Sequence, residues 1–170
     1  MGGSRRAWGW HPLVDEWAAR IVADAAIRPG ELVLDIGAGD GALTGPLVAA
    51  GARVVAVEPH PERVRRLRER FAGAPVAVVA ADATGLRLPG RPFRVVASPP
   101  YRISSALLRI LLAPGSRLVR ADLVLQRAVV RRFAAGRWAR WELAAGRPLP
   151  RRAFRPPPQV DSAVLVVRRR

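Results

Sequence analysis

A short glycine-rich loop constrains the fold of this chain more than any other feature. The apolar run 32–36 leads into a segment in which Gly37, Gly39 and Gly41 alternate with small residues, and a helix-like apolar pattern follows. This order predicts a strand, a tight turn and a helix. Because only glycine-like backbone turns so closely against a ligand, the loop, Ala38 included, is predicted to bind a nucleoside cofactor.

Polar residues extend the same predicted site. Three later strand-like segments end at polar side chains: residues 53–57 at Glu58, 76–80 near Asp82 and 93–97 at Ser98. Glu58 lies where a carboxylate would accept hydrogen bonds from ribose hydroxyls, roughly 20 residues after the loop, and this fits NAD and S-adenosylmethionine equally. Either acid alone could instead cap a helix. The carboxyl ends of parallel strands meet in one crevice, so the ordered set favours one pocket.

The run Ser98-Pro99-Pro100-Tyr101 provides groups suited to a planar amine. The Ser98 hydroxyl and the Pro99 carbonyl can accept hydrogen bonds from an exocyclic amine, and the two prolines fix the backbone that aims them. Tyr101 can stack on a base. In isolation the run would be an ordinary turn at the end of a strand. After the glycine loop and two acids, it favours methyl transfer onto a base.

Together these motifs resemble those of the rRNA adenine N6-methyltransferases, the family that includes the erythromycin-resistance (Erm) enzymes and the small-subunit dimethyladenosine transferases. The glycine loop, Glu58, Asp82 and the run 98–101 occupy the places of that family's motifs. Segment 152–165 is similar to its phenylalanine-x-proline-x-proline-x-valine segment. The likeness covers nearly the whole chain. It implies S-adenosylmethionine as the cofactor and an adenine amine as the methyl acceptor.

The resemblance also implies roles for individual residues. The implied cofactor contacts are His11, Leu13, Gly37, Ala38, Gly39, Glu58, Pro59, Asp82, Ala83 and Ser98. The implied catalytic residues are Ser98, Pro99, Pro100, Tyr101 and Phe154. In this arrangement Phe154 closes the face of the target base opposite Tyr101. No dedicated general base is required, and the sequence offers no obvious one.

The chain departs from the family pattern in three places. Ser98 stands where members acting on rRNA generally carry asparagine, and Trp10 and His11 replace the usual glutamine and asparagine. Cofactor affinity or pose is therefore expected to differ. The chain ends at Arg170, where the family normally continues into a small helical domain. We expect that domain to be absent.

The composition favours a polyanionic partner. All 29 basic residues are arginine, against 13 acidic residues, which gives a formal net charge of +16. Such a field attracts nucleic acid, although arginines on solvated helix faces are a simpler alternative for part of the set. The predicted RNA contacts are Arg131, Arg132, Arg151, Arg152 and Arg155. Trp138 and Trp141 fall among arginines and are either stacking platforms or packing residues.

Strand-like and helix-like segments alternate along the chain. Helices are predicted at 14–26 and 126–135, and strands at 32–36, 53–57, 76–80, 93–97, 121–125 and 163–167. This alternation predicts an α/β fold with a doubly wound, mostly parallel sheet. The resemblance makes it a seven-stranded Rossmann-like methyltransferase sheet with an antiparallel strand near one edge. We expect one domain, 1–170, with an N-terminal arm and helix at 1–30 and the sheet core at 31–170.

The sequence also limits other partners. Two histidines without cysteine predict no metal site, and no apolar run of about 18 residues predicts a membrane span. A cytoplasmic monomer is expected. The leading hypothesis is S-adenosylmethionine-dependent N6-methylation of an adenine in rRNA, with 23S rRNA favoured over 16S and macrolide resistance as the consequence. The alternatives are a DNA base amino-methyltransferase and a non-catalytic RNA-binding relative.

Overall fold

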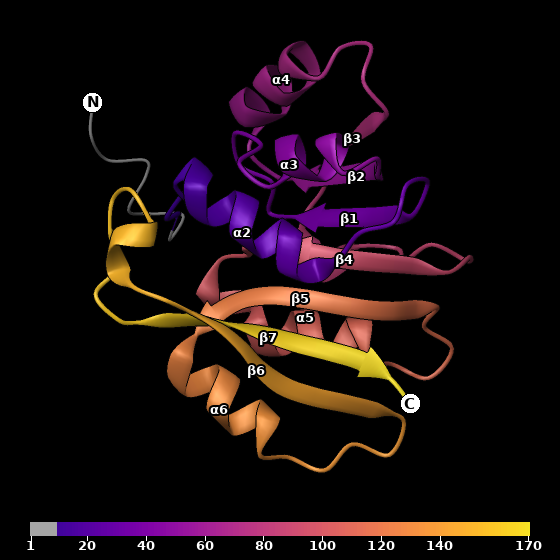
Figure 1. Cartoon of the computed structure of the whole chain (residues 1–170). Coiled ribbons are helices and arrows are strands. Elements are labelled where there is room, and N and C mark those ends of the chain that lie inside the picture. The colour runs from indigo at the N-terminus through magenta and orange to yellow at the C-terminus, as the bar shows by residue number, and fades with distance from the viewer. Residues whose placement is uncertain (1–9) are drawn as a thin grey trace.

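A single mixed sheet organises the molecule, which is seen here as a computed structural model that describes residues 10–170. The sheet has seven strands in the order β3-β2-β1-β4-β5-β7-β6 (Figure 1). The parallel strands are β1 (Leu32–Ile36), β2 (Arg53–Glu58), β3 (Val76–Ala80), β4 (Phe93–Ala97) and β5 (Leu118–Gln126). Strand β7 (Ser162–Arg169) lies antiparallel to β5 and to β6 (Trp141–Leu149). The predicted doubly wound sheet with an antiparallel strand near one edge is confirmed.

Helices cover both faces because side chains alternate along buried strands. Val33 and Val96 face one core cluster with α2 (Asp15–Ala25) and α3 (Thr44–Ala49), and α4 (Pro61–Arg70) packs on the same face. Leu34 and Val95 face the opposite cluster, which includes residues of α5 (Ser104–Leu111) and α6 (Arg127–Ala134). Short 3-10 turns complete the chain: η1 (Ala83–Gly85), η2 (Tyr101–Ile103) and η3 (Arg151–Ala153). None of the helices within residues 10–170 has the length and apolar character that crossing a membrane requires.

Strand β6 was not among the predicted strands. Its sequence lacks valine, isoleucine and threonine, and it contains Gly146 and Pro148, which weaken strand propensity. Pairing with β7 accommodates both residues through a register shift between Ala145 and Pro148. The strand therefore depends on its neighbour rather than on its own local preference.

The two tryptophans of the arginine-rich segment take part in packing. Trp141 is 5% exposed on β6, with the Arg169 guanidinium 4.5 Å from its ring centroid. The Trp138 indole Nε1 donates to the Phe133 carbonyl at 3.1 Å, and the two rings lie against each other. Of the two alternatives that the sequence leaves open, the structure shows packing.

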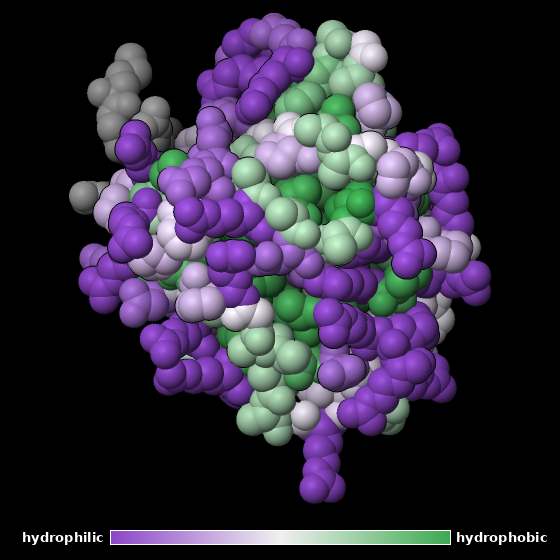
Figure 2. Space-filling view, viewed as in Figure 1, coloured by the Kyte–Doolittle hydropathy of each residue, from purple (hydrophilic) through white to green (hydrophobic). Residues whose placement is uncertain are grey.

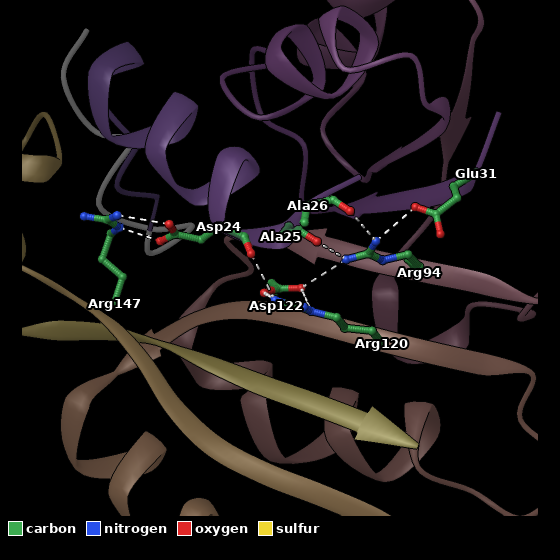
Figure 3. Close-up of polar contacts among 8 residues, drawn as sticks. All are labelled: Asp24, Ala25, Ala26, Glu31, Arg94, Arg120, Asp122 and Arg147. Atoms are coloured by element: carbon green, nitrogen blue, oxygen red, sulfur yellow. Dashed lines mark hydrogen bonds and ion pairs between the residues drawn. The ribbon is translucent and has the colours of Figure 1, made fainter. Parts of the chain in front are cut away.

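A buried charge network holds the C-terminal end of α2 on the sheet (Figure 3). Arg94 of β4 donates to the Ala25 carbonyl, to the Ala26 carbonyl at 3.2 Å and to Glu31 at 2.9 Å. Its guanidinium also lies 3.9 Å from Asp122 of β5. Helix C-termini leave carbonyls without partners inside the helix, and Arg94 supplies donors for two of them. On its other side, Asp122 accepts hydrogen bonds from Arg120 at both carboxylate oxygens, at 2.9 and 2.8 Å.

Candidate active site

Two adjoining cavities open at the carboxyl ends of the parallel strands, where the predicted site residues meet. The first has a volume of about 50 Å³ and is lined by Trp10, His11, Gly37, Glu58, Pro59, Arg63, Asp82, Ala83, Ser98, Pro99, Pro100, Tyr101, Arg102 and Ile103. The second, of about 40 Å³, is lined by Trp10, His11, Pro12, Leu13, Asp35, Gly37, Ala38, Asp40, Ala42, Leu43 and Ser98. The structure thus brings together the glycine loop, both predicted acids and the run Ser98–Tyr101.

The glycine loop approaches its neighbours so closely that side chains would not fit. Gly37 and Gly39 have φ angles of 76° and 59°. A Cβ at Gly39 would lie 2.8 Å from the Trp10 indole Nε1, and one at Gly37 would lie 3.4 Å from the Pro99 Cα. Glycine avoids both the strain of positive φ and these clashes. The loop therefore brings its backbone directly against Trp10 and against the run that follows β4.

Glu58 is a buried carboxylate at the end of β2, only 3% exposed. Its Oε2 accepts a hydrogen bond from the Gly39 amide at 3.3 Å, and its Oε1 accepts one from Arg63 at 3.4 Å. Burial raises the pKa of Glu58, although the charge of Arg63 and the Gly39 amide oppose that rise. These two hydrogen bonds are long, so Glu58 can still accept from stronger donors such as ribose hydroxyls.

Asp82 both lines the first cavity and caps the turn that follows. Its Oδ1 accepts from the Thr84 amide at 2.9 Å and from the Thr84 hydroxyl at 2.8 Å, which closes the N-terminal end of η1. The hydrogen bond from the Thr84 amide lowers the pKa of Asp82. The capping role that the sequence offered as an alternative is therefore present together with the position at the cavity.

Asp35 lines the second cavity and was not among the predicted site residues. It is 1% exposed on β1, and its Oδ2 accepts from the Thr44 hydroxyl at 2.7 Å. Burial raises its pKa to about 7, and the nearby charge of Glu58 adds to the rise. A single aspartate inside an apolar strand, directly before the glycine loop, is the sequence signal that could have identified it.

The run after β4 presents Tyr101 in a fixed orientation. The Tyr101 and Ser162 hydroxyls lie 2.6 Å apart, so a residue at the start of β7 anchors the ring. Burial raises the pKa of Tyr101, although the Ser162 hydroxyl opposes that rise. The backbone is held as well, because the Ser104 hydroxyl donates to the Tyr101 carbonyl at 2.8 Å. These contacts position the ring before any base arrives.

Phe154 lines neither cavity, contrary to its predicted place against the target base. The Phe154 side chain is 1% exposed and belongs to the core cluster beneath α2. Its backbone forms an antiparallel bridge with Leu13. The flanking hydrogen bonds run from the Val14 amide to the Ala153 carbonyl at 2.8 Å and from the Arg155 amide to the Pro12 carbonyl at 3.0 Å. This pairing places the apolar Phe154 ring in the core, where it is removed from water. The segment therefore supports the N-terminal arm.

The Trp10 side chain lies against Gly39 of the glycine loop and lines both cavities. The Arg63 guanidinium lies 3.7 Å from the centroid of a Trp10 ring, a cation–π distance, and the same guanidinium contacts Glu58. The sequence drew attention to Trp10 only as a departure from the family pattern. Arg63 could not be distinguished there from the other arginines of α4, because only the tertiary structure turns it inward, to 6% exposure.

The predicted RNA-contacting arginines fall into two groups. Arg151, Arg152 and Arg155 are exposed around the segment that pairs with the N-terminal arm beside the cavities. Arg131 and Arg132 are exposed in the last turn of α6, which packs on the other face of the sheet. Figure 2 shows hydrophilic side chains over most of the face seen in Figure 1, with smaller hydrophobic areas between them. The first group lies beside the site.

Fold and site together define a class. A parallel sheet with an antiparallel β7 between β5 and β6, a glycine loop after β1 and an acid at the end of β2 make up the Rossmann-like methyltransferase fold. The crystal structure of the 23S rRNA methyltransferase ErmE superimposes with a TM-score of 0.84 at 35% identity, covering 93% of this chain and 69% of that one. The chain belongs to the ribosomal RNA adenine dimethylase family, whose model matches residues 4–170.

Curated relatives come from both branches of this family. The mycinamicin-resistance protein MyrB of Micromonospora griseorubida is 37% identical over 99% of this chain, and the chain spans 57% of its length. The ribosomal RNA small subunit methyltransferase A of Cupriavidus taiwanensis is 35% identical over 95% of this chain, which spans 65% of that protein. This chain thus corresponds to about three fifths of such relatives.

Proposed function

We propose that this chain transfers a methyl group from S-adenosylmethionine to the N6 amine of an adenine in rRNA, in the cytoplasm where ribosomes are. One observation carries the proposal: Gly37 of the glycine loop, Glu58 and the run Ser98–Tyr101 line the same cavity. This combination joins groups for a nucleoside cofactor to groups for a planar amine. Membership in the ribosomal RNA adenine dimethylase family supports the same reaction.

The residues present fit the cofactor. Glu58 offers carboxylate oxygens to ribose hydroxyls, and the glycine loop leaves its backbone open to close approach. Pro59, Asp82 and Ala83 line the first cavity beside Glu58, and Leu13 and Ala38 line the second; we propose that these residues contact the cofactor as well. Bound S-adenosylmethionine would supply an electrophilic methyl group at a sulfonium centre.

The chain's own residues then orient the acceptor. The Ser98 hydroxyl oxygen and the Pro99 carbonyl can each accept a hydrogen bond from the amine, which directs its nitrogen lone pair toward the methyl group. Tyr101, fixed by Ser162, can stack on the base, and base–aromatic stacking contributes about 1–3 kcal/mol. Holding the amine in line with the methyl donor in this way contributes a large part of the rate. Arg151, Arg152 and Arg155 are proposed to hold nearby phosphates.

We propose 23S rRNA as the substrate in preference to 16S rRNA, with macrolide resistance as the outcome. The support is the likeness to the mycinamicin-resistance protein and to the 23S rRNA methyltransferase ErmE. Likeness to small subunit methyltransferases of similar identity keeps 16S rRNA as the direct competitor in the test.

The test is transfer of labelled methyl to purified, protein-free 23S rRNA, 16S rRNA and duplex DNA in parallel. We expect label in 23S rRNA, located on the N6 of an adenine, and loss of that label in Tyr101→Ala. Label in 16S rRNA alone would overturn the substrate assignment and leave the reaction intact. Label in DNA alone, or none in any substrate while S-adenosylmethionine still binds, would overturn the proposed function.

A further inference from the structure

The hydrogen bond made by His11 determines which of its ring nitrogens carries a proton. His11 Nδ1 lies 3.0 Å from the Pro156 carbonyl oxygen. A carbonyl oxygen can only accept a hydrogen bond, so Nδ1 must be the donor. In the neutral imidazole the other nitrogen, Nε2, is then a lone-pair acceptor.

The backbone around His11 is held by strand-like pairing with the segment that contains Phe154. The Val14 amide donates to the Ala153 carbonyl at 2.8 Å, and the Arg155 amide donates to the Pro12 carbonyl at 3.0 Å. The His11 side chain continues this series of contacts to Pro156. Two segments that lie far apart in the sequence therefore fix both the position and the tautomer of one imidazole.

The imidazole stands at the place where the acceptor amine is proposed to bind. His11 and Ser98 line both cavities. The His11 ring is inclined by only 21° to the Tyr101 ring, with 6.3 Å between the centroids. His11 and Tyr101 therefore face the same cavity side by side, and the Nδ1 of the imidazole is already engaged.

We propose that Nε2 of His11 accepts the proton that the target amine releases during methyl transfer; this inference rests on the proposed function. The amine lone pair forms the bond to the methyl carbon, and the electron pair of the broken carbon–sulfur bond leaves with sulfur. The nitrogen becomes cationic and loses a proton to Nε2, while the N–H electrons stay on nitrogen. The Pro156 carbonyl stabilises the resulting imidazolium through Nδ1–H, and the proton then passes to water.

Other ionisable groups face the same cavities and bear on the pH dependence. They are Tyr101 and Arg102 from η2, Glu58 from β2, Arg63 from α4, and Asp82, Asp35 and Asp40 from the strand ends and the glycine loop. Among these, Asp35 has its pKa raised by burial to about 7. Any pH dependence due to Asp35 survives when His11 is replaced, so a comparison of variants separates the two groups.

The tautomer is tested without any reaction. The chain has two histidines, so nitrogen-15 NMR of histidine-labelled protein contains two imidazoles, and His60→Asn assigns them. We expect the neutral His11 ring to be protonated on Nδ1, with Nε2 showing the shift of an unprotonated nitrogen. A neutral ring protonated on Nε2 would overturn the inference whatever the activity.

The reaction is tested with His11→Asn, whose side-chain amide keeps a donor for Pro156 but has no titrating nitrogen. We expect kcat to fall about 100-fold, at the low end of the contribution of acid–base groups. We also expect the rate of the variant to stay constant toward acidic pH, where the rate of the wild type falls. Binding of S-adenosylmethionine, measured by calorimetry without RNA, separates the loss of a proton acceptor from the loss of a cofactor contact. His60→Asn should keep the acidic decrease.

The outcomes separate this inference from the proposed function. An active wild type whose pH profile is unchanged in His11→Asn would overturn the role of His11 alone. A loss of kcat/KM explained entirely by weaker cofactor binding would do the same and would make His11 a cofactor contact. A wild type that methylates no rRNA would overturn the proposed function, and the role of His11 with it.

Discussion

Two groups of buried ionisable residues on the same sheet are arranged in opposite ways. Beneath the C-terminal end of α2, Arg94 and Asp122 have their partners inside the protein, from Glu31, Arg120 and two helix carbonyls (Figure 3). At the carboxyl edge, Asp35 and Glu58 are as deeply buried but have fewer or longer hydrogen bonds, and burial raises the pKa of both.

This difference distinguishes a structural charge from one kept for a ligand. A buried charge is costly unless hydrogen bonds and opposite charges compensate it. The network under α2 supplies most of that compensation within the fold, although the buried Arg94 Nε has no hydrogen-bond partner among the described residues. At the carboxyl edge of the sheet, hydrogen bonds and opposite charges compensate the burial of Asp35 and Glu58 only in part. Such incomplete compensation is common at sites where a polar ligand binds.

The largest expected effect comes from breaking the closed network. Arg94→Met would leave Asp122 with one partner fewer and the Ala25 and Ala26 carbonyls without their donors. Removing one partner of a buried pair typically costs about 3–5 kcal/mol, so the free energy of unfolding measured with urea should fall by that amount. A loss below about 1 kcal/mol would show that this network is not the structural charge cluster described here.

At the open edge, Asp35→Asn should stabilise the protein. The folded pKa of about 7 lies above 3.8, the ordinary value for an aspartate, so between these two pH values the folded chain holds a proton that the unfolded chain loses, and stability falls as pH rises. Asparagine does not titrate, so the stability of the variant does not fall over this pH range. Its gain should reach at most about 4 kcal/mol at pH 8 and disappear toward pH 4.

Urea unfolding of wild type and Asp35→Asn across this pH range is the measurement. Asparagine keeps an acceptor for the Thr44 hydroxyl, so the comparison isolates the charge. A variant that is less stable than wild type at pH 8 would contradict the assignment of Asp35 to an uncompensated position.

Glu58→Gln should weaken the binding of S-adenosylmethionine more than it changes the stability of the fold. Hydrogen bonds to a charged group contribute about 1.5–3 kcal/mol, which corresponds to roughly 10- to 150-fold in affinity. Burial disfavours the charged form of Glu58, but the buried Arg63 guanidinium loses its charge partner in the variant, so the two effects on the free energy of unfolding oppose each other. Calorimetry measures the binding and urea unfolding measures the stability, with the exposed Glu62→Gln on α4 as control.

The smallest effect is expected for the ion pair of Arg147 with Asp24, at the exposed margin of the charge network under α2. Arg147 donates to Asp24 at 2.6 and 3.0 Å, but the two side chains are 33% and 45% exposed. Exposed pairs contribute about 0–1 kcal/mol, so Arg147→Met should cost less than 1 kcal/mol. The Arg147 hydrogen bond lowers the pKa of Asp24, so this contribution is present above about pH 4 and is lost as pH falls further. A cost comparable to that of Arg94→Met would remove the distinction between the exposed margin and the buried centre.

Prediction from the sequence succeeded where local pattern and strand order suffice. The four parallel strands β1 to β4 were predicted at nearly their observed positions, because each is a short apolar run that ends in a polar residue or a turn. Glu58, Asp82 and Ser98 line one cavity, as expected from the geometry of a parallel sheet. Residues 1–9 of the expected N-terminal arm lie outside the described residues.

Prediction failed where a contact between distant segments decides the outcome. Phe154 was assigned to the target base, but pairing of its segment with Leu13 turns the ring into the core. Strand β6 has little strand propensity of its own and is formed by pairing with β7. Arg63 resembles its exposed neighbours on α4 and is distinguished only by the Glu58 carboxylate that it meets.

The sequence by itself determined the order of strands and helices, the glycine loop and the chemical groups that converge at the carboxyl edge, because backbone preference and side-chain periodicity act locally. The tertiary structure alone decided which internal partners those groups have and how deeply they are buried. Segment 153–156 holds His11, β7 anchors Tyr101, and burial shifts the pKa of Asp35. Burial and hydrogen bonding depend on what lies opposite a residue in space, and no local pattern records that.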